Sequence, residues 1–152
     1  MKYFLDTEFI EFPNQIHLIS IGIKCEDGRK YYAISSEFDS SLADDWVKTN
    51  VISKLEDIPR KNIKEIKKEI INFVGNDKNP EFWAYYADYD WVVFCWIFGR
   101  MIDLPEHFPM YCRDLKQLMD FIGKDKIPNP NNEHNALADA EWNEQLYNHL
   151  MK

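Results

Sequence analysis

The stretch YFLDTEFIEFPNQIHLISIGIKCEDGRKYYAIS, residues 3–35, decides the fold. It holds three segments typical of β-strands, at residues 3–5, 16–24 and 30–35. An Asp-Gly pair within residues 26–29 is a strong signal for a two-residue hairpin turn. Because strands joined by tight turns run antiparallel, we expect the chain to begin with a three-stranded antiparallel meander.

Helical and extended patterns alternate after the meander. The helices are marked by hydrophobic residues at helical spacing, by Asp114 as an N-cap and by Gly99 as a C-terminal stop. This order predicts an α/β fold with a mixed sheet, the meander plus parallel strands, flanked by helices. We expect helices at residues 60–73, 89 or 90–99, 115–122 and 135–150, a short helix within 42–51, strands at 81–86 and 110–112, and a loop at 124–133.

Size and net charge limit which functions the protein can have. The 152 residues fit a single domain, residues 1–152, and a hydrophobic content of 45% allows a packed core. The net charge of −8 argues against a protein that grips nucleic acid by bulk positive charge. It does not exclude one that meets phosphates through bound metal ions, because carboxylate ligands themselves make the charge negative.

The sequence also bears on location. The longest apolar run, residues 91–98, is too short to span a bilayer, and Asp6 stands where a signal peptide needs apolar residues. Cys25, Cys95 and Cys112 are odd in number and lack C-x-x-C spacing, so neither a disulfide framework nor a zinc knuckle is expected. We therefore expect a cytoplasmic protein with no membrane partner.

Asp6 and Glu8 form an Asp-x-Glu pair at the end of the first strand. Because side chains alternate across a strand, both carboxylates point to the same face. Two carboxylates this close repel each other unless a cation lies between them, and oxygen ligands suit Mg²⁺ or Mn²⁺. Taken alone the pattern is weak, and two surface acids at a strand end are the simpler interpretation.

Asp88 and Asp90 lie between the strand at 81–86 and the following apolar helix. An acid at such a junction can reach over the sheet edge toward a ligand. Asp90 directly precedes the apolar residues and is expected in the first turn of the helix. Ordinary N-capping is the simpler explanation of a lone aspartate there.

His134 and Asp139 are five residues apart. On one helix they would be splayed by about 140°, so they converge more easily if His134 lies in the preceding loop and Asp139 in the second turn. A loop-borne histidine suits proton transfer. A surface histidine and a surface aspartate are the simpler interpretation, but Ala136, Ala138 and Ala140 would let the helix approach a sheet closely.

The four carboxylates and the histidine together are a more specific signal than any one of them, because all lie at the ends of elements predicted to share one sheet. FLDTEF at residues 4–9 resembles the first motif of the DnaQ-like 3′–5′ exonucleases. YADYD at 86–90 resembles the second motif, and HNALADA at 134–140 resembles the third in its histidine-bearing, DEDDh form. Similarity to the ribonuclease AS branch of this family extends over residues 1–11, 18–23, 26–29 and 31–33. The members of that branch are polyadenylate-preferring 3′-exoribonucleases.

The resemblance implies a ribonuclease H-like fold and two-metal hydrolysis that releases nucleoside 5′-monophosphates from the 3′ ends of single-stranded RNA, with a preference for adenylate-rich RNA. It also implies two Mg²⁺ (or Mn²⁺) ions as cofactors and a homodimer. In the second motif, Asp90 is favoured over Asp88 because it has the family's spacing to the apolar helix that follows. The implied catalytic residues are the metal ligands Asp6, Glu8, Asp90 and Asp139 and the general base His134.

Substrate contacts are expected beside the first motif. Phe9, Ile10 and Glu11 follow it directly and are candidates to hold the 3′-terminal nucleotide. Trp46 and Tyr89 are further candidates for base stacking, which contributes about 1–3 kcal/mol per base. Core packing is the commoner use of an aromatic side chain.

Three other functions stay open at this point. They are a 3′–5′ exonuclease acting on single-stranded DNA, a catalytically silent RNA-binding module of the same fold, and a ribonuclease H-type endonuclease. The basic run at residues 60–68 is likewise open between a phosphate-attracting surface and an ordinary solvated helix face.

Overall fold

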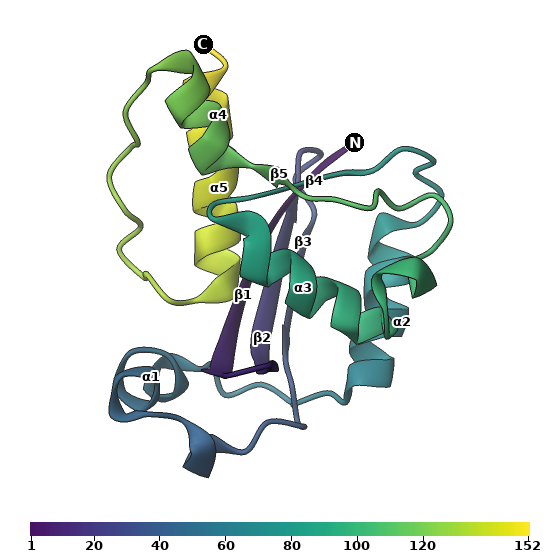
Figure 1. Ribbon diagram of the computed structural model, residues 1–152, viewed down its shortest axis with the longest axis vertical. Helices are drawn as coiled ribbons and strands as arrows, with labels where there is room; N and C mark the ends of the chain where they lie inside the picture. The colour runs from purple at the N-terminus through teal and green to yellow at the C-terminus, as the bar shows by residue number, and fades with distance from the viewer.

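The computed structural model describes all 152 residues and shows an α/β fold built on one mixed five-stranded sheet (Figure 1). The strand order is β3-β2-β1-β4-β5. The first three strands are antiparallel, whereas β4 pairs parallel to β1 and β5 pairs parallel to β4. The strands are β1 (Lys2–Phe12), β2 (Gln15–Cys25), β3 (Lys30–Ile34), β4 (Glu81–Ala84) and β5 (Arg113–Asp114).

Helices pack on the sheet from both sides (Figure 1). None of them combines the length and the apolar character that crossing a lipid bilayer requires. Short 3₁₀ turns lie at Ser40–Leu42, Ile52–Lys54 and Met101–Asp103. The helices are α1 (Asp45–Asn50), α2 (Ile63–Val74), α3 (Ala87–Phe98), α4 (Leu115–Ile122) and α5 (Ala136–Leu150).

The alternation of side chains along β1 separates two sides of the sheet. Tyr3 and Leu5 join the main hydrophobic core, together with Ile66 of α2 and Phe94 of α3. Phe4, between them, points the other way and packs against Tyr147 of α5, with ring centroids 5.5 Å apart. Even-numbered residues on this part of β1 therefore face α5.

The meander is confirmed, and two boundaries differ for identifiable reasons. The first strand continues from the predicted residues 3–5 to Phe12, because it pairs with β2 throughout and turns back at Pro13–Asn14, where Asn14 has a φ of 66°. The helix predicted from residue 60 begins at Ile63. Asn62 and Glu65 cap it reciprocally, each side chain accepting a hydrogen bond from the backbone N–H of the other.

Asp114 explains two further differences. The strand predicted at 110–112 is wrong, because β5 is Arg113–Asp114, which pairs with Trp83 and Ala84 of β4. The helix predicted from residue 89 or 90 begins at Ala87, whose N–H donates a 2.7 Å hydrogen bond to Asp114 Oδ2. The carboxylate thus caps α3 from a distant part of the chain, while its other oxygen accepts from the N–H of Gln117 to cap α4.

The amino-terminal turn of α5 lies directly on β2 at Gly22. A Cβ atom at Gly22 would lie only 2.2 Å from the carbonyl oxygen of Ala136. Ala136 and Ala140 are fully buried, which confirms the prediction that small residues let this helix approach the sheet. Since Gly22 pairs with Asp6 across the sheet, the glycine sets how closely α5 can approach the strand that carries Asp6.

We expect Gly22→Ala to destabilise the protein by about 1–3 kcal/mol, because the added methyl group must displace the backbone of α5. The measurement is the free energy of unfolding in urea. Ser20→Ala is a matched control in the same strand, since it adds no volume and removes a buried hydroxyl that has no hydrogen-bond partner. Equal stability of Gly22→Ala and the wild type would contradict the described contact.

Candidate active site

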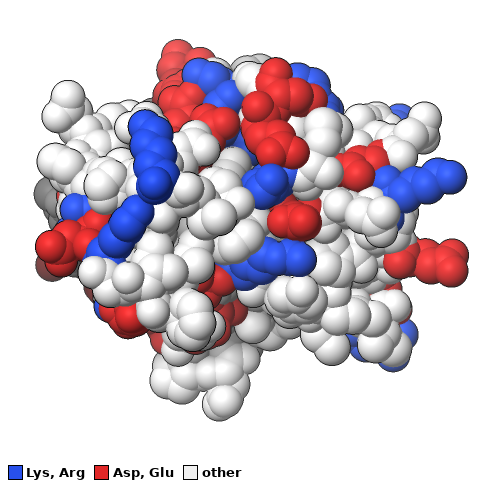
Figure 2. All heavy atoms as spheres, turned by 90° about the horizontal axis from the view of Figure 1, so that it is seen from above, with Lys and Arg blue, Asp and Glu red and all other residues white.

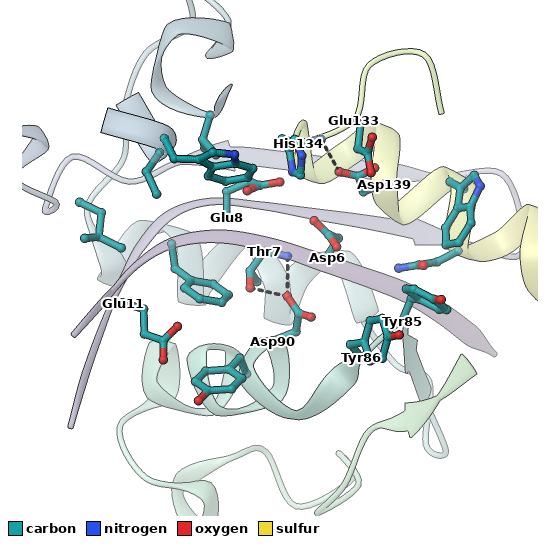
Figure 3. Close-up of a pocket in the computed structure, with 18 of the residues that line it drawn as sticks. Asp6, Thr7, Glu8, Glu11, Tyr85, Tyr86, Asp90, Glu133, His134 and Asp139 are labelled. Atoms are coloured by element: carbon teal, nitrogen blue, oxygen red, sulfur yellow. Dashed lines mark hydrogen bonds between the residues drawn. The ribbon is translucent and has the colours of Figure 1, made fainter. Parts of the chain in front are cut away.

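One pocket of about 880 Å³ is lined by every residue that the resemblance implied as catalytic and by every candidate for substrate binding (Figure 3). It surrounds the part of β1 that extends beyond β4, between α3, α5 and the segment of α1. The pocket is lined by Asp6, Glu8, Phe9, Ile10, Glu11, Trp46, Tyr89, Asp90, His134 and Asp139, among others.

Asp90 reaches the pocket along a free edge of the sheet. Strand β4 pairs with β1 only at Lys2–Phe4, so the next part of this edge has no strand partner. Asp90 Oδ1 accepts hydrogen bonds from the N–H of Thr7 at 2.8 Å and from its hydroxyl at 2.5 Å. The carboxylate is thereby anchored through one oxygen, and its other oxygen is available to a ligand. Asp88 is exposed and does not line this pocket.

His134 and Asp139 lie close together, as the sequence suggested, but fewer helical residues separate them than expected. His134 lies in the loop before α5, whereas Asp139 lies in the first helical turn and not the second. His134 has a φ of 68°, and its N–H donates a 2.8 Å hydrogen bond to Asp139 Oδ2. Potential ligand atoms of Glu8, His134 and Asp139 all lie within 4.8 Å of one another, which is close enough for a shared cation.

Burial raises the pKa of every carboxyl group in this cluster. The pKa of Asp6 lies well above its usual value, with added repulsion from Asp90, Glu8 and Asp139. Burial and the same kind of repulsion raise the pKa of Glu8 to about 8. Burial raises the pKa of Asp90 to about 7 and that of Asp139 to about 6, against the opposing hydrogen bonds from Thr7 and His134. The cluster therefore favours protons or another source of positive charge.

The segment of α1 contacts the loop that carries His134. The rings of Trp46 and His134 meet edge to face with centroids 4.9 Å apart. Lys54 donates a 3.3 Å hydrogen bond to the carbonyl oxygen of Glu133, and its charge acts to lower the pKa of both Glu8 and Asp139. Lys54 was missed by the sequence analysis, since nothing local distinguishes it from other surface lysines.

The remaining candidates for substrate binding differ in what their side chains offer. Phe9 stacks on Tyr89, with ring centroids 6.0 Å apart and an interplanar angle of 19°. Ile10 is buried in a small core cluster with Phe38 and lends the pocket little side-chain surface. Glu11 is exposed at the rim.

The pocket also contains residues that sequence reasoning did not select. Thr7 could have been selected from its position between Asp6 and Glu8, although only the structure shows its contact with Asp90. The others come from the segment of α1, from the turn after β4, from the loop before α5 and from α5 itself. They include Tyr85, Tyr86, Lys126, Asn129, Trp142 and Asn143.

The basic run at residues 60–68 is not part of this pocket. Lys61 forms an ion pair with Glu69 at 2.7 Å, and Lys67 donates to the carbonyl oxygen of Phe98 at 3.4 Å. These contacts favour the interpretation as a solvated helix face. On the face seen from above in Figure 2, basic and acidic side chains are interspersed and form no large patch of one sign.

Comparison with known proteins gives the family. The family described as "3'-5' exoribonuclease Rv2179c-like domain" matches residues 1–151. Two relatives from Mycobacterium tuberculosis, 3'-5' exoribonuclease MT2234.1 of strain CDC 1551 / Oshkosh and 3'-5' exoribonuclease Rv2179c of strain ATCC 25618 / H37Rv, are each 42% identical over 147 residues. Each match covers 92% of this chain and 87% of the relative.

A similar solved structure supports the fold alone. It is a chain in the structure of the yeast NOT1 MIF4G domain co-crystallized with CAF1, and the match has a TM-score of 0.52 and 14% sequence identity. The match covers 99% of this chain and 80% of that chain. The match over residues 1–151 and the relatives at 42% identity place the chain in the family of Rv2179c-like 3′–5′ exoribonuclease domains.

Proposed function

We propose that the protein is a metal-dependent 3′–5′ exoribonuclease that releases nucleoside 5′-monophosphates from single-stranded RNA. The observation that carries the proposal is the meeting of His134 with four carboxyl groups in one pocket. The family supports the direction of attack and the choice of RNA. The resemblance to the DEDDh motifs supports a ribonuclease H-like fold and the histidine-assisted form, and the ribonuclease AS pattern supports a preference for adenylate-rich RNA.

The donor set fits divalent cations. Carboxylate oxygens are the ligands that Mg²⁺ and Mn²⁺ prefer, and the raised pKa values show a cluster short of positive charge. We propose that Asp6, Glu8, Asp90 and Asp139 hold two Mg²⁺ (or Mn²⁺) ions. When bound, such ions supply activation of a water nucleophile and charge stabilisation for the leaving 3′ oxygen.

His134 is the proposed general base. Its side chain lies beside Glu8 and Asp139, and the hydrogen bond from its backbone to Asp139 keeps the loop in place. A neutral imidazole nitrogen accepts a proton from the attacking water. The water oxygen forms a bond to phosphorus, the bond to the 3′ oxygen of the penultimate nucleotide breaks, and the terminal nucleotide leaves with its 5′ phosphate.

The 3′-terminal nucleotide is proposed to lie toward Phe9 and Tyr89. The half-exposed ring of Tyr89 offers a face for base stacking, and the carboxylate of Glu11 can accept a hydrogen bond from a ribose hydroxyl. Trp46 borders the same region but also packs against His134, so its removal should affect both nucleotide binding and the placement of His134. Ile10 contributes mainly through its backbone, because its side chain is buried.

A homodimer is proposed from the resemblance. A groove of about 590 Å³ lies beside the pocket, between the turn of the β1–β2 hairpin and the outer face of α3. Exposed Val92 and Trp96 give it apolar surface of the kind that protein interfaces cover. Sedimentation equilibrium tests the assembly directly.

Digestion of end-labelled homopolymer RNAs and matched DNA tests the proposed activity. With Mg²⁺ or Mn²⁺, we expect stepwise shortening from the 3′ end, release of 5′-monophosphates, fastest turnover of polyadenylate, and no reaction with chelator. Faster degradation of DNA would favour the deoxyribonuclease alternative. Internal cuts would indicate an endonuclease, and binding without any product would indicate a catalytically silent module.

Substitution of the carboxyl groups tests the site. We expect Asp6→Asn and Asp139→Asn to lower kcat by at least about 100-fold while leaving the fold intact, because each removes a proposed metal ligand. Asp88→Asn is the matched control, since this exposed residue lies outside the pocket and should keep wild-type turnover. Near-wild-type rates for Asp6→Asn would show that the assignment is wrong.

His134→Asn separates proton transfer from binding. Asparagine tolerates the positive φ of this position but cannot act as a general base at neutral pH. We expect it to lose most turnover and to keep the affinity for Mn²⁺ and for RNA. Unchanged turnover would remove His134 from the mechanism.

The raised pKa values predict how the stability of the metal-free protein depends on pH. The pKa values of Asp139, Asp90 and Glu8 lie at about 6, 7 and 8, above the value of about 4 for an unfolded carboxyl group. The folded state therefore binds protons more tightly, and its stability falls as the pH rises through this range.

In chelator we expect the Tm to be at least about 4 °C lower at pH 8.5 than at pH 5.5, and Mg²⁺ or Mn²⁺ to restore most of the loss. The double variant Glu8→Gln, Asp139→Asn should show a smaller dependence on pH and a smaller response to metal. A Tm that rises with pH in the metal-free wild type would contradict the described burial of these groups.

A further inference from the structure

The pocket has two aromatic ends, and the proposed function uses only one of them. Glu11 lies on one side of Asp6 and Asp90, and Tyr85 and Tyr86 lie on the other (Figure 3). The sheet explains this order. Strand β4 ends beside the start of β1, so the turn that follows it lies near Asp6. Glu11 is five residues further along β1, about 16 Å of extended chain.

Tyr86 is displayed at the rim of the pocket on a firm support. The residue is 61% exposed, and its ring packs edge to face on Tyr85 with centroids 4.5 Å apart. Tyr85 in turn packs edge to face on Trp142 at 5.2 Å. The indole of Trp142 donates a 2.7 Å hydrogen bond to the carbonyl oxygen of Pro128, which ties the loop before α5 to this end of the pocket.

The backbone of Tyr86 has a φ of 57°, a conformation that tyrosine rarely adopts. The turn therefore presents a large ring to solvent in a strained backbone conformation. Because the ring is exposed, its burial does not offset the energetic cost of that conformation. An exposed aromatic ring that is held in place by packing from beneath is suited to stacking on a nucleobase.

An exonuclease has to hold a nucleotide on each side of the phosphate that it cleaves. The cleaved phosphate lies at the carboxyl groups, so one nucleoside lies toward Glu11 and the other toward Tyr86. The charges of the lining residues distinguish the two directions. Glu11 of β1 and Asp44, the residue before α1, line the pocket away from Tyr86, where a further phosphate would be repelled.

Lys126 lines the pocket from the loop that Trp142 holds. Its ammonium group donates to the Asn129 side chain at 2.8 Å, and Asn129 donates in turn to the carboxylate of Glu133 at 2.8 Å, so Lys126 itself forms no direct ion pair. The 3′ end of an RNA carries no further phosphate, whereas the upstream chain carries one per nucleotide. The 3′ end thus fits the acidic side and the upstream chain fits the side of Lys126.

We propose that Tyr86, supported by Tyr85, stacks the base of the penultimate nucleotide, and that Lys126 contacts the phosphate on its 5′ side. The proposal rests on the proposed exoribonuclease function and adds to it a second nucleotide subsite. It makes binding depend on at least two nucleotides at the 3′ end. Because stacking tolerates any base, this subsite contributes affinity without selecting a sequence.

The test places 2-aminopurine, whose fluorescence is quenched by stacking, at either the terminal or the penultimate position of a short oligoadenylate. Binding is measured with Ca²⁺, so that the readout does not depend on hydrolysis. The main variant is Tyr86→Asn, because asparagine tolerates the positive φ and removes the ring. Tyr86→Phe is the matched control, which keeps the ring and loses only the hydroxyl.

We expect Tyr86→Asn to abolish quenching of the penultimate probe, to leave the terminal probe unchanged, and to weaken RNA binding about tenfold. Tyr86→Phe should behave as the wild type. An oligoadenylate that lacks the penultimate base should bind the wild type and Tyr86→Asn equally. Lys126→Gln should lower the dependence of binding on salt concentration.

Two results would overturn the subsite. One is an equal effect of Tyr86→Asn on the intact and the abasic RNA, as expected if Tyr86 contacts a second copy of the chain. The other is loss of quenching at the terminal probe in place of the penultimate one. In both cases normal hydrolysis of RNA by the wild type leaves the exoribonuclease proposal standing, whereas a wild type that neither binds nor degrades RNA contradicts both proposals.

Discussion

The contact between the first turn of α5 and Gly22 of β2 is the constraint on which the rest of the structure depends. Carboxyl groups held together without a cation repel one another, so the pocket cannot assemble itself by attraction between its own side chains. Packing has to supply that free energy. The buried faces of Ala136 and Ala140 and the hydrogen bond from Asn143 to the carbonyl oxygen of Leu5 hold α5 against the sheet. Asp139 is then placed over β1 as a consequence.

A second constraint is the short pairing of β4 with β1. Had β4 been longer, its backbone would occupy the edge of β1 at Thr7, and Asp90 would have no donors there. Ending β4 at Ala84 leaves the edge free, and Asp114 of the neighbouring strand caps α3 so that the helix starts early enough to present Asp90. The site is therefore located where the sheet is incomplete, which is where α/β folds leave room for ligands.

Local patterns in the sequence predicted what depends on local chemistry. The Asp-Gly turn gave the meander, and the alternation of residues along a strand put Asp6 and Glu8 on one face. The resemblance to the second exonuclease motif, through the family's spacing to the apolar helix, separated Asp90 from Asp88, in agreement with their positions in the structure.

What the sequence could not predict depends on distant residues. The role of Gly22 is visible only when Ala136 is placed upon it. The early start of α3 depends on Asp114. Ile10 lines the pocket, but that its side chain belongs to a core cluster is visible only in the structure, because apolar strand residues beside a site and in a core look alike in the sequence. Sequence reasoning thus found the carboxyl groups and left open how the fold brings them together, as well as the aromatic end at Tyr86.

These constraints together imply that binding of the proposed metal ions would be coupled to folding. Burial raises the pKa values of the carboxyl groups, so at neutral pH the metal-free site weakens the fold that builds it. A bound cation removes that penalty and adds binding free energy to the folded state alone. The loop carrying His134 contributes few buried side chains of its own and is held through Asp139 and Trp46. Relief of the repulsion at Asp139 should therefore stabilise the placement of His134 as well, so that occupancy of the proposed metal site and readiness of the proposed general base would rise together.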